Sequence, residues 1–112
     1  MEFDSNKPIY LQICDSIEER ILRGELKSGD HIPSVREMGS DIGVNPNTVA
    51  RSFEKLTDLG VIHTRRGLGY FVSDDAAENV LRDARKSFLE VEVPAFVHRM
   101  ELLGLTINDI IK

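Results

Sequence analysis

Polar side chains that can read DNA bases lie close together in the middle of the chain: Asn45, Asn47, Thr48 and Arg51. Asparagine can pair with the edge of adenine, arginine with that of guanine, and threonine with a base or a thymine methyl group. At ~100° per residue, one side of a helix would carry Asn47, Thr48, Arg51 and Lys55. The spacing therefore predicts a recognition helix for the DNA major groove. The alternative is an ordinary amphipathic helix with a solvated polar face.

The local sequence favours a helix here, running from Pro46 to Leu59. Gly43 can adopt the left-handed conformation that ends a preceding helix. Asn45 is a good N-cap, and Pro46 fits the first helical position, where an N–H is not needed. Apolar residues then recur at helical spacing and form a predicted core face: Val49, Phe53 and Leu56. A helix, a short glycine turn and a second helix make a helix-turn-helix.

The helix before this turn is predicted from Ser34 onward, because Ser34 and Glu37 have the spacing of a capping box. We expect its core-facing residues to be Val35, Met38 and Ile42. Arg36 falls in the first turn, where the helix dipole disfavours a cation. A nearby phosphate or guanine would explain it, and Ser34 and Arg36 are therefore candidate DNA contacts. The alternative is an incidental surface arginine.

A β-hairpin is predicted after the recognition helix. Residues 61–65 and 70–72 are rich in β-branched and aromatic side chains, and glycines lie between them. The tip carries Arg65, Arg66 and Gly67, where the backbone can approach a phosphate or enter a narrow minor groove. Taken alone, this would be a solvent-exposed tip with incidental charges. After a helix-turn-helix, a basic wing is the better interpretation.

The first helix is predicted at residues 8–23, followed by a loop through residues 24–33. An apolar stripe marks its buried side: Tyr10, Ile13, Cys14, Ile17 and Ile21. Its exposed side is mostly acidic, so we expect a scaffold and not a DNA reader. Cys14 is the single cysteine, which excludes an internal disulfide, and its place on the stripe predicts a buried, inert thiol.

Neither an enzyme nor a cofactor site is predicted. His31, His63 and His98 are far apart and lack zinc-type spacing. No serine carries a nucleophile motif, and GLGYF is not a nucleotide-binding loop. We therefore expect no catalytic residue, no metal and no cofactor.

The 112 residues carry a net charge of −5, distributed unevenly. Residues 1–30 hold four basic and seven acidic residues, residues 31–73 five and four, and residues 74–112 five and eight, which gives −3, +1 and −3. The middle third could therefore present a local basic face, with salt-dependent binding to DNA. No apolar run could span a bilayer and no secretory signal is recognisable, so we expect no membrane contact and a cytoplasmic protein.

Residues 74–112 are predicted to be helical, with a break or kink near Val93 caused by Pro94, a second segment at 95–103, and a cap at Thr106. The segment is too short for its own core, so we expect a two-fold dimer. The candidate dimerisation residues are Val80, Leu81, Ala84, Phe88, Val91, Phe96, Met100 and Leu103. The alternative is that this tail packs back on the first helix of the same chain.

Residues Pro8 to Val72 resemble the winged helix-turn-helix domain of GntR-type bacterial transcription regulators, through the motifs PSVRE, NPNTVAR and RRGLGYFV. The short helical tail is similar to that of the YtrA subfamily. The resemblance implies a homodimeric repressor that binds a palindromic operator, often controlling its own operon and a transporter operon. It implies DNA contacts by Arg36, Asn45, Asn47, Thr48, Arg51, Arg66 and Gly67.

Some positions depart from the family pattern. Met38-Gly39 stands where Leu-Ala is common, which predicts a looser second helix. Pro46 and Ala50 stand where the family often has arginine, so no base preference can be transferred.

Together these features predict a mainly α fold with a small β-hairpin. A winged helix-turn-helix DNA-binding domain would occupy residues 1–73, and a C-terminal helical dimerisation segment residues 74–112. The predicted function is sequence-specific transcriptional regulation on double-stranded DNA. An unidentified small-molecule effector would bind between the tail and the winged domain. The alternatives are a winged-helix protein-interaction module and a fragment of a larger regulator.

Overall fold

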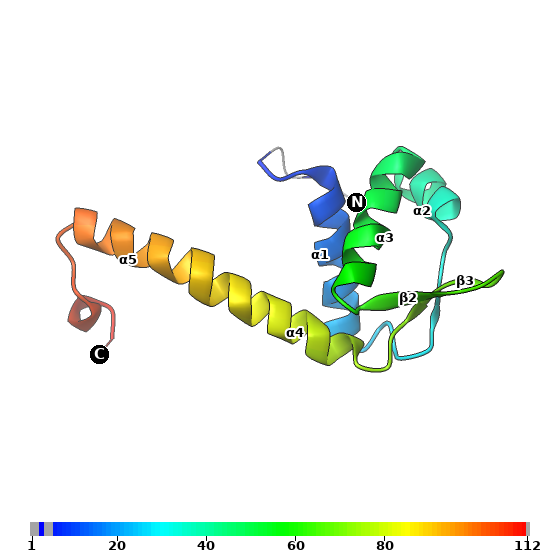
Figure 1. Cartoon of the computed structure of the whole chain (residues 1–112). Coiled ribbons are helices and arrows are strands. Elements are labelled where there is room, and N and C mark those ends of the chain that lie inside the picture. Colours follow the sequence, from blue (N-terminus) through cyan, green and yellow to red (C-terminus); the bar gives the residue numbers. More distant parts are fainter. Residues whose placement is uncertain (1–2, 4–5, 112) are drawn as a thin grey trace. The chain divides into compact units, whose positions relative to one another are not determined.

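The computed structural model describes residue 3 and residues 6–111, and the chain forms two compact units, Met1–Val80 and Leu81–Lys112 (Figure 1). The first unit combines three packed helices with a small three-stranded antiparallel sheet. The second is helical. This confirms the predicted fold class, a mainly α protein with a winged helix-turn-helix domain and a C-terminal helical segment.

The helices of the first unit are α1 (Ile9–Leu22), α2 (Val35–Ile42) and α3 (Pro46–Asp58). Each agrees closely with its predicted range. α3 packs against both α1 and α2, so it is the central helix of the unit. The other two helices thus decide which side of α3 is buried and which side can meet a ligand.

The turn between α2 and α3 is built as its residue types predict. Gly43 has φ 70°, in the left-handed region, and ends α2. The Asn45 Oδ1 atom accepts a hydrogen bond from the Asn47 N–H at 2.8 Å, which caps α3. At the other end of α2, the Ser34 Oγ atom accepts from the Glu37 N–H at 3.1 Å and Glu37 Oε1 accepts from the Ser34 N–H at 3.2 Å. The predicted capping box is confirmed.

The sheet contains β1 (His31–Ile32), β2 (Ile62–Arg65) and β3 (Gly69–Val72), in the order β1-β3-β2. The hairpin of β2 and β3 confirms the predicted wing. β1 is a correction, because its residues were assigned to a loop. Two residues are too few to show an alternating pattern, and β1 exists only through pairing with β3, as in His31 opposite Phe71.

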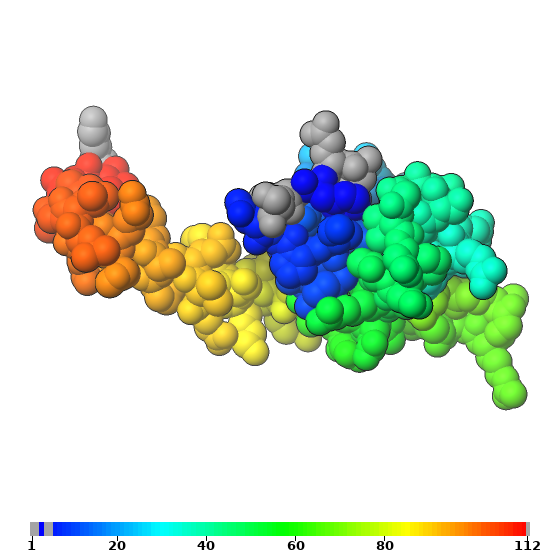
Figure 2. All heavy atoms as spheres, turned by 90° about the horizontal axis from the view of Figure 1, so that it is seen from above, coloured from blue at the N-terminus to red at the C-terminus, as the bar shows by residue number. Residues whose placement is uncertain are grey.

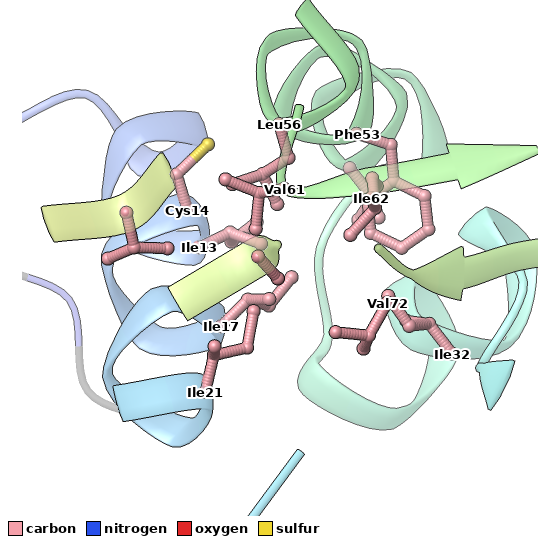
Figure 3. Close-up of a cluster of buried hydrophobic side chains, with 13 residues drawn as sticks. Ile13, Cys14, Ile17, Ile21, Ile32, Phe53, Leu56, Val61, Ile62 and Val72 are labelled. Carbon is pink, nitrogen blue, oxygen red and sulfur yellow. The ribbon is translucent and has the colours of Figure 1, made fainter. Parts of the chain in front are cut away.

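The core joins the helices to the inner face of the sheet (Figure 3). Ile13 and Ile17 of α1 and Phe53 of α3 are buried, and the Phe53 ring meets the Tyr70 ring edge-on, with centroids 4.8 Å apart. Further buried residues come from the sheet: Ile32, Ile62 and Val72. Because side chains alternate across a strand, Tyr70 points inward and Phe71 outward.

Cys14 is buried in this core, as predicted. Its Sγ atom lies 3.5 Å from the carbonyl oxygen of Ser52. Burial raises the pKa of the Cys14 thiol to about 11, because a thiolate is poorly solvated there. The thiol is therefore neutral near pH 7, and its role is packing.

The helix α4 (Ala76–Ser87) begins within the first unit. Ala76 and Val80 are buried in the core, and the Asn79 Nδ2 atom donates a hydrogen bond to the carbonyl oxygen of Gly60 at 2.8 Å. The Val80 side chain is therefore buried in the core of the winged unit and is not available to a partner chain. Leu81 is the first of the candidate dimerisation residues that is exposed.

The second unit stays helical through the predicted break. A π-helical segment at Phe88–Glu92 leads into α5 (Val93–Leu102), and Val93 keeps helical dihedrals of −63° and −48°. A π turn shifts the hydrogen-bond register, so the missing N–H and the ring of Pro94 are accommodated without ending the helix. The helix therefore does not break at Pro94, its type changes beside the proline, and the alternative of a kink near Val93 stays a prediction. Thr106 caps a final 3₁₀ turn at Ile107–Asp109, as predicted.

Gly39 allows α2 to pack closely against the turn that follows it, and the looser helix expected from this position stays a prediction. It is buried, and a Cβ atom there would lie 2.7 Å from the carbonyl oxygen of Val44. Glycine in a helix costs up to ~1 kcal/mol relative to alanine, whereas overpacking costs ~1–3 kcal/mol.

We therefore expect Gly39→Ala to lower the free energy of unfolding by about 1 kcal/mol. The measurement is urea unfolding followed by circular dichroism. Ser40→Ala, on the exposed side of the same helix, is the control and should be neutral or slightly stabilising. A Gly39→Ala variant as stable as the control would show that the turn between α2 and α3 can shift to accommodate the added methyl group without a measurable cost.

Candidate nucleic-acid interface

The exposed face of α3 is displaced around the helix from the predicted polar face, toward Ala50 and Glu54. Val49, Ser52, Phe53 and Leu56 are buried, while Asn47, Ala50, Arg51 and Glu54 are exposed. Thr48 and Lys55, predicted to lie on the open face, are half-buried at its edge. Glu54 was not anticipated there, and its carboxylate would repel phosphates. The first turns of α3 are therefore the part best suited to read bases.

The N-terminal turn of α3 carries Asn45, Asn47 and Thr48. The side-chain oxygen of Asn45 is engaged in the cap, so its role in the structure is to hold the helix start. Asn47 is exposed, and Thr48 lies beside it with part of its surface open. Asn47 is thus the residue of this turn most accessible to a base edge.

Arg51 is held by an aromatic ring of α1. Its guanidinium carbon lies 4.0 Å from the centroid of the Tyr10 ring, a cation–π contact. The Ser52 hydroxyl also donates to the carbonyl oxygen of Tyr10 at 2.7 Å. These contacts fasten α1 to the exposed edge of α3 and fix the direction of the arginine.

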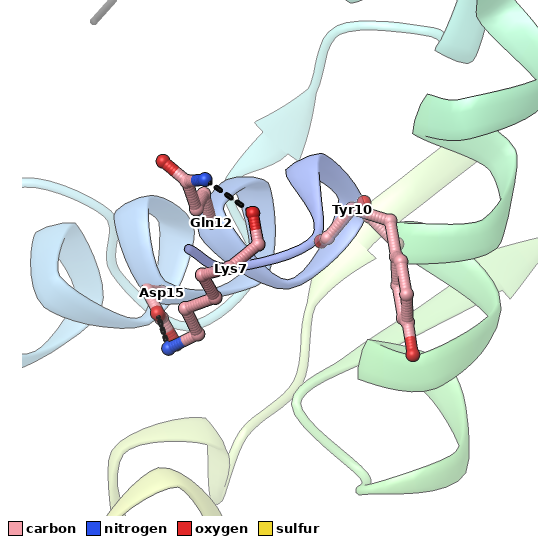
Figure 4. A network of polar contacts seen from close by, with 5 residues as sticks. Lys7, Tyr10, Gln12 and Asp15 are labelled. Carbon is pink, nitrogen blue, oxygen red and sulfur yellow. Dashed lines mark hydrogen bonds and ion pairs between the residues drawn. The ribbon is translucent and has the colours of Figure 1, made fainter. Parts of the chain in front are cut away.

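The start of α1 is itself tied down (Figure 4). The Lys7 ammonium pairs with the Asp15 carboxylate, and Gln12 Nε2 donates to the carbonyl oxygen of Lys7 at 2.7 Å. The hydrogen bond to Asp15 raises the pKa of Lys7. Figure 4 shows the Tyr10 side chain lying beside α3. Tyr10 was predicted only as a core residue; the structure adds contact with Arg51.

The start of α2 contributes Ser34 and Arg36. The capping hydrogen bonds from Ser34 lower the pKa of Glu37, because they stabilise its carboxylate. The Ser34 hydroxyl oxygen also accepts the hydrogen bond from the Glu37 N–H. Arg36 is exposed two positions further along the chain. A phosphate placed at this helix end would meet both groups and the α2 dipole.

The wing presents Arg65, Arg66 and Gly67 at its tip. The tip turn is closed by the Leu68 N–H, which donates to the carbonyl oxygen of Arg65 at 2.9 Å. The guanidinium carbon of Arg65 lies 4.9 Å from the Phe71 ring centroid. The yellow-green hairpin projects from the winged unit in Figures 1 and 2. Phe71 was missed from the sequence, although alternation with the inward Tyr70 could have placed it on the outer face.

The arginines of the three regions share one property. Among the described residues, Arg36, Arg51, Arg65 and Arg66 form no ion pair with an acidic side chain. In contrast, cations of α1 and its flanks are paired, as in Arg23 with Glu19 at 2.7 Å. Exposed arginines without a carboxylate partner are available to phosphates and bases.

Metal chemistry and membrane insertion find no support in the described part of the chain. It contains no group of three or more His, Cys, Asp or Glu side chains that could hold a metal ion. None of its helices has the length and apolar character needed to cross a bilayer.

The family model for bacterial regulatory proteins of the gntR family matches residues 9–72. The chain belongs to the GntR family. This matched region contains the helix-turn-helix and the wing described above, and the family consists of transcriptional regulators rather than enzymes. The chain is therefore a GntR-type transcriptional regulator with a winged helix-turn-helix DNA-binding fold.

Similar proteins extend this likeness beyond the winged domain. The HTH-type transcriptional repressor YtrA of Bacillus subtilis is 44% identical over 95% of this chain and 81% of its own length. A GntR-family regulator from Listeria monocytogenes has a TM-score of 0.78 at 35% identity, covering 97% of this chain and 94% of that one. The AraR DNA-binding domain, solved with operator ORR3, has a TM-score of 0.58 at 27% identity, covering 65% of this chain and 86% of that one.

The tail of this GntR-type chain exposes most of its candidate dimerisation residues. The side chains of Leu81, Phe88, Val91, Phe96 and Leu103 are 36%, 53%, 63%, 54% and 61% exposed. Ala84 is exposed, Met100 is half-buried, and Val80 lies in the winged core. Phe96, Met100 and Leu103 also line an apolar hollow of about 400 Å³ with Leu105 and Ile110.

The contact between Arg51 and Tyr10 can be tested without DNA. We expect Arg51→Ala to lower the free energy of unfolding by ~0.5–1 kcal/mol, because the cation–π contact is lost. In a Tyr10→Leu background the same substitution should cost little, since no ring remains. Urea unfolding of the four proteins gives the coupling energy directly. Additive effects would show that the two side chains do not interact.

Proposed function

We propose that this GntR-type regulator is a homodimeric repressor that binds a palindromic operator through its winged domain. The observation that carries the proposal is the set of arginines on α2, α3 and the wing that form no ion pair among the described residues. Arg36, Arg51 and the wing pair Arg65–Arg66 lie within one compact unit, on a chain whose net charge is −5. Arginine that is left without a carboxylate fits phosphate and guanine recognition.

The contacts divide by chemistry. Asn47 and Thr48 at the start of α3 would read base edges in the major groove, with Arg51 at the adjoining edge. Ser34 and Arg36 at the start of α2 would hold a phosphate, and Asn45 would support the turn. Arg65, Arg66 and Gly67 would follow the backbone or enter the minor groove. The likeness to the AraR domain, solved with operator DNA, supports an operator as the ligand.

A second copy of the chain is the proposed partner of the tail. No described apolar side chain of residues 81–111 is buried. Burying one large apolar side chain contributes ~1.5–3 kcal/mol, so a surface of this kind favours association. Leu81, Ala84, Phe88 and Val91 would meet the partner along one helix, and Phe96, Met100 and Leu103 would surround side chains entering the hollow beside α5. A two-fold dimer matches a palindromic site.

The regulated genes and the signal are proposed from the resemblance to YtrA-like regulators. The operator would lie before the protein's own operon and a transporter operon, and binding would repress them. An unidentified small-molecule effector would change the affinity of the regulator for this operator. A cytoplasmic location follows from this role.

A protein-interaction module without DNA binding is the second candidate, favoured by the acidic net charge. The two functions differ in one measurement. A regulator selects a duplex sequence and shifts it at low salt, whereas an interaction module does neither.

The decisive experiment is selection of bound sequences from random duplex DNA, followed by affinity measurements on the selected site. We expect Asn47→Ala to cost ~1–3 kcal/mol and to relax preference at one base pair. Arg66→Ala should weaken binding to all sequences similarly and reduce the salt slope by about 1.

Arg23→Ala is the matched control, because Arg23 is paired with Glu19 on α1, away from the proposed contacts. It should bind like the unmodified protein. Binding that is unchanged when Arg36, Arg51 and Arg66 are replaced together would refute the assignment of the interface. Failure to select any sequence would favour the interaction module.

The oligomeric state can be tested by one substitution in each unit. We expect the unmodified protein to have twice its chain mass of 12.6 kDa in sedimentation, and Leu103→Asp to halve it. The added carboxylate cannot be buried in an apolar interface without a partner. Leu22→Asp, at an exposed leucine that ends α1, should remain dimeric. A Leu103→Asp protein that stays dimeric would place the interface elsewhere.

A further inference from the structure

The outer face of the sheet carries a cluster of rings that the DNA contacts described above do not include. In the strand register, His31 and His63 lie on either side of Phe71, one on each neighbouring strand. The ring centroids of His31 and Phe71 are 5.0 Å apart, edge to face, and those of His63 and Phe71 are 6.2 Å apart, stacked. Arg65 lies over the same Phe71 ring.

His31 reaches from this face to the tip of the wing. Its Nε2 atom lies 3.1 Å from the carbonyl oxygen of Leu68, 37 residues along the chain. A carbonyl oxygen can only accept a hydrogen bond, so Nε2 must carry the hydrogen and donate it.

Gly69 makes room for this contact. It has φ +94°, and a Cβ atom there would lie 3.2 Å from His31 Nε2. The imidazole therefore lies against bare backbone at the base of the tip. His31 touches the wing at two consecutive residues, Leu68 and Gly69, and packs on a third, Phe71.

We propose that His31 is a positioning residue for DNA binding: its Nε2–H holds the Leu68 carbonyl and so fixes the wing tip that carries Arg65 and Arg66. The inference rests on the proposed contact of the wing with DNA. A hairpin tip that is ordered before binding loses less conformational entropy on the duplex. His31 itself need not touch DNA.

The hydrogen bond and the ring packing of His31 can be separated by substitution. His31→Phe keeps an aromatic ring against Phe71 and loses the donor. His31→Gln loses the ring and keeps an N–H group that can reach the Leu68 carbonyl. His63→Phe is the matched control, because His63 Nδ1 contacts Ser73 Oγ at 3.0 Å at the other end of the hairpin.

The experiment measures the affinity of the full chain for its selected operator, together with NMR relaxation of the wing-tip amides in the free protein. We expect His31→Phe to weaken binding about three- to tenfold and to increase the mobility of Leu68 and Gly69. His31→Gln should restore most of the affinity, and His63→Phe should change neither quantity. In an Arg65→Ala/Arg66→Ala background, His31→Phe should have no further effect on affinity.

Several results would overturn the proposal. In the first, His31→Phe binds the operator as well as the unmodified chain, while Arg65→Ala/Arg66→Ala binds more weakly. The wing would then contact DNA without needing the hydrogen bond from His31 to Leu68. In the second, His31→Phe lowers the affinity by the same factor in the Arg65→Ala/Arg66→Ala background as in the unmodified chain. This would indicate a general structural effect. If the double arginine variant itself binds normally, the proposed wing contact fails, and this inference fails with it.

Discussion

Burial of one face of α3 against α1, α2 and the sheet is the constraint on which the proposed interface depends. Phe53 meets Tyr70 of β3 edge-on, and the next residue of the same strand, Phe71, lies under Arg65 on the outer face. One strand thus connects the core of the recognition helix to the base of the wing. Because side chains alternate along a strand, β3 contacts the buried side of α3 through Tyr70 and the wing arginine Arg65 through Phe71.

Local charge, and not net charge, decides whether this acidic chain can approach DNA. The excess of acidic residues lies in residues 1–30 and 74–112, and ion pairs on α1 neutralise part of its basic charge. The arginines near the start of α2, on α3 and on the wing have no such partners in the described chain. Two of them lie over rings, Arg51 on Tyr10 and Arg65 on Phe71, which directs them without neutralising them.

The two units differ in how far they bury their apolar side chains. The winged unit closes its own core, and α4 adds Ala76 and Val80 to it. The second unit keeps a helical backbone through Pro94 but leaves its large apolar side chains open. The proposed dimer accounts for this exposure, and it would also set the separation of two recognition helices, which a single winged unit cannot do.

Local sequence determined the helices, their caps and the hairpin, because Ser34, Gly43, Asn45 and Pro46 act through neighbouring backbone groups. The tertiary structure decided what depends on distant partners. β1 forms only against β3, Arg51 finds Tyr10 on another helix, and His31 reaches Leu68 across 37 residues. Helical periodicity could place Val80 on the apolar stripe of the tail. Only the tertiary packing showed that the Val80 side chain is buried in the core of the winged unit. Pro94 predicted a break or a kink near Val93, whereas the backbone stays helical there through a π-helical segment.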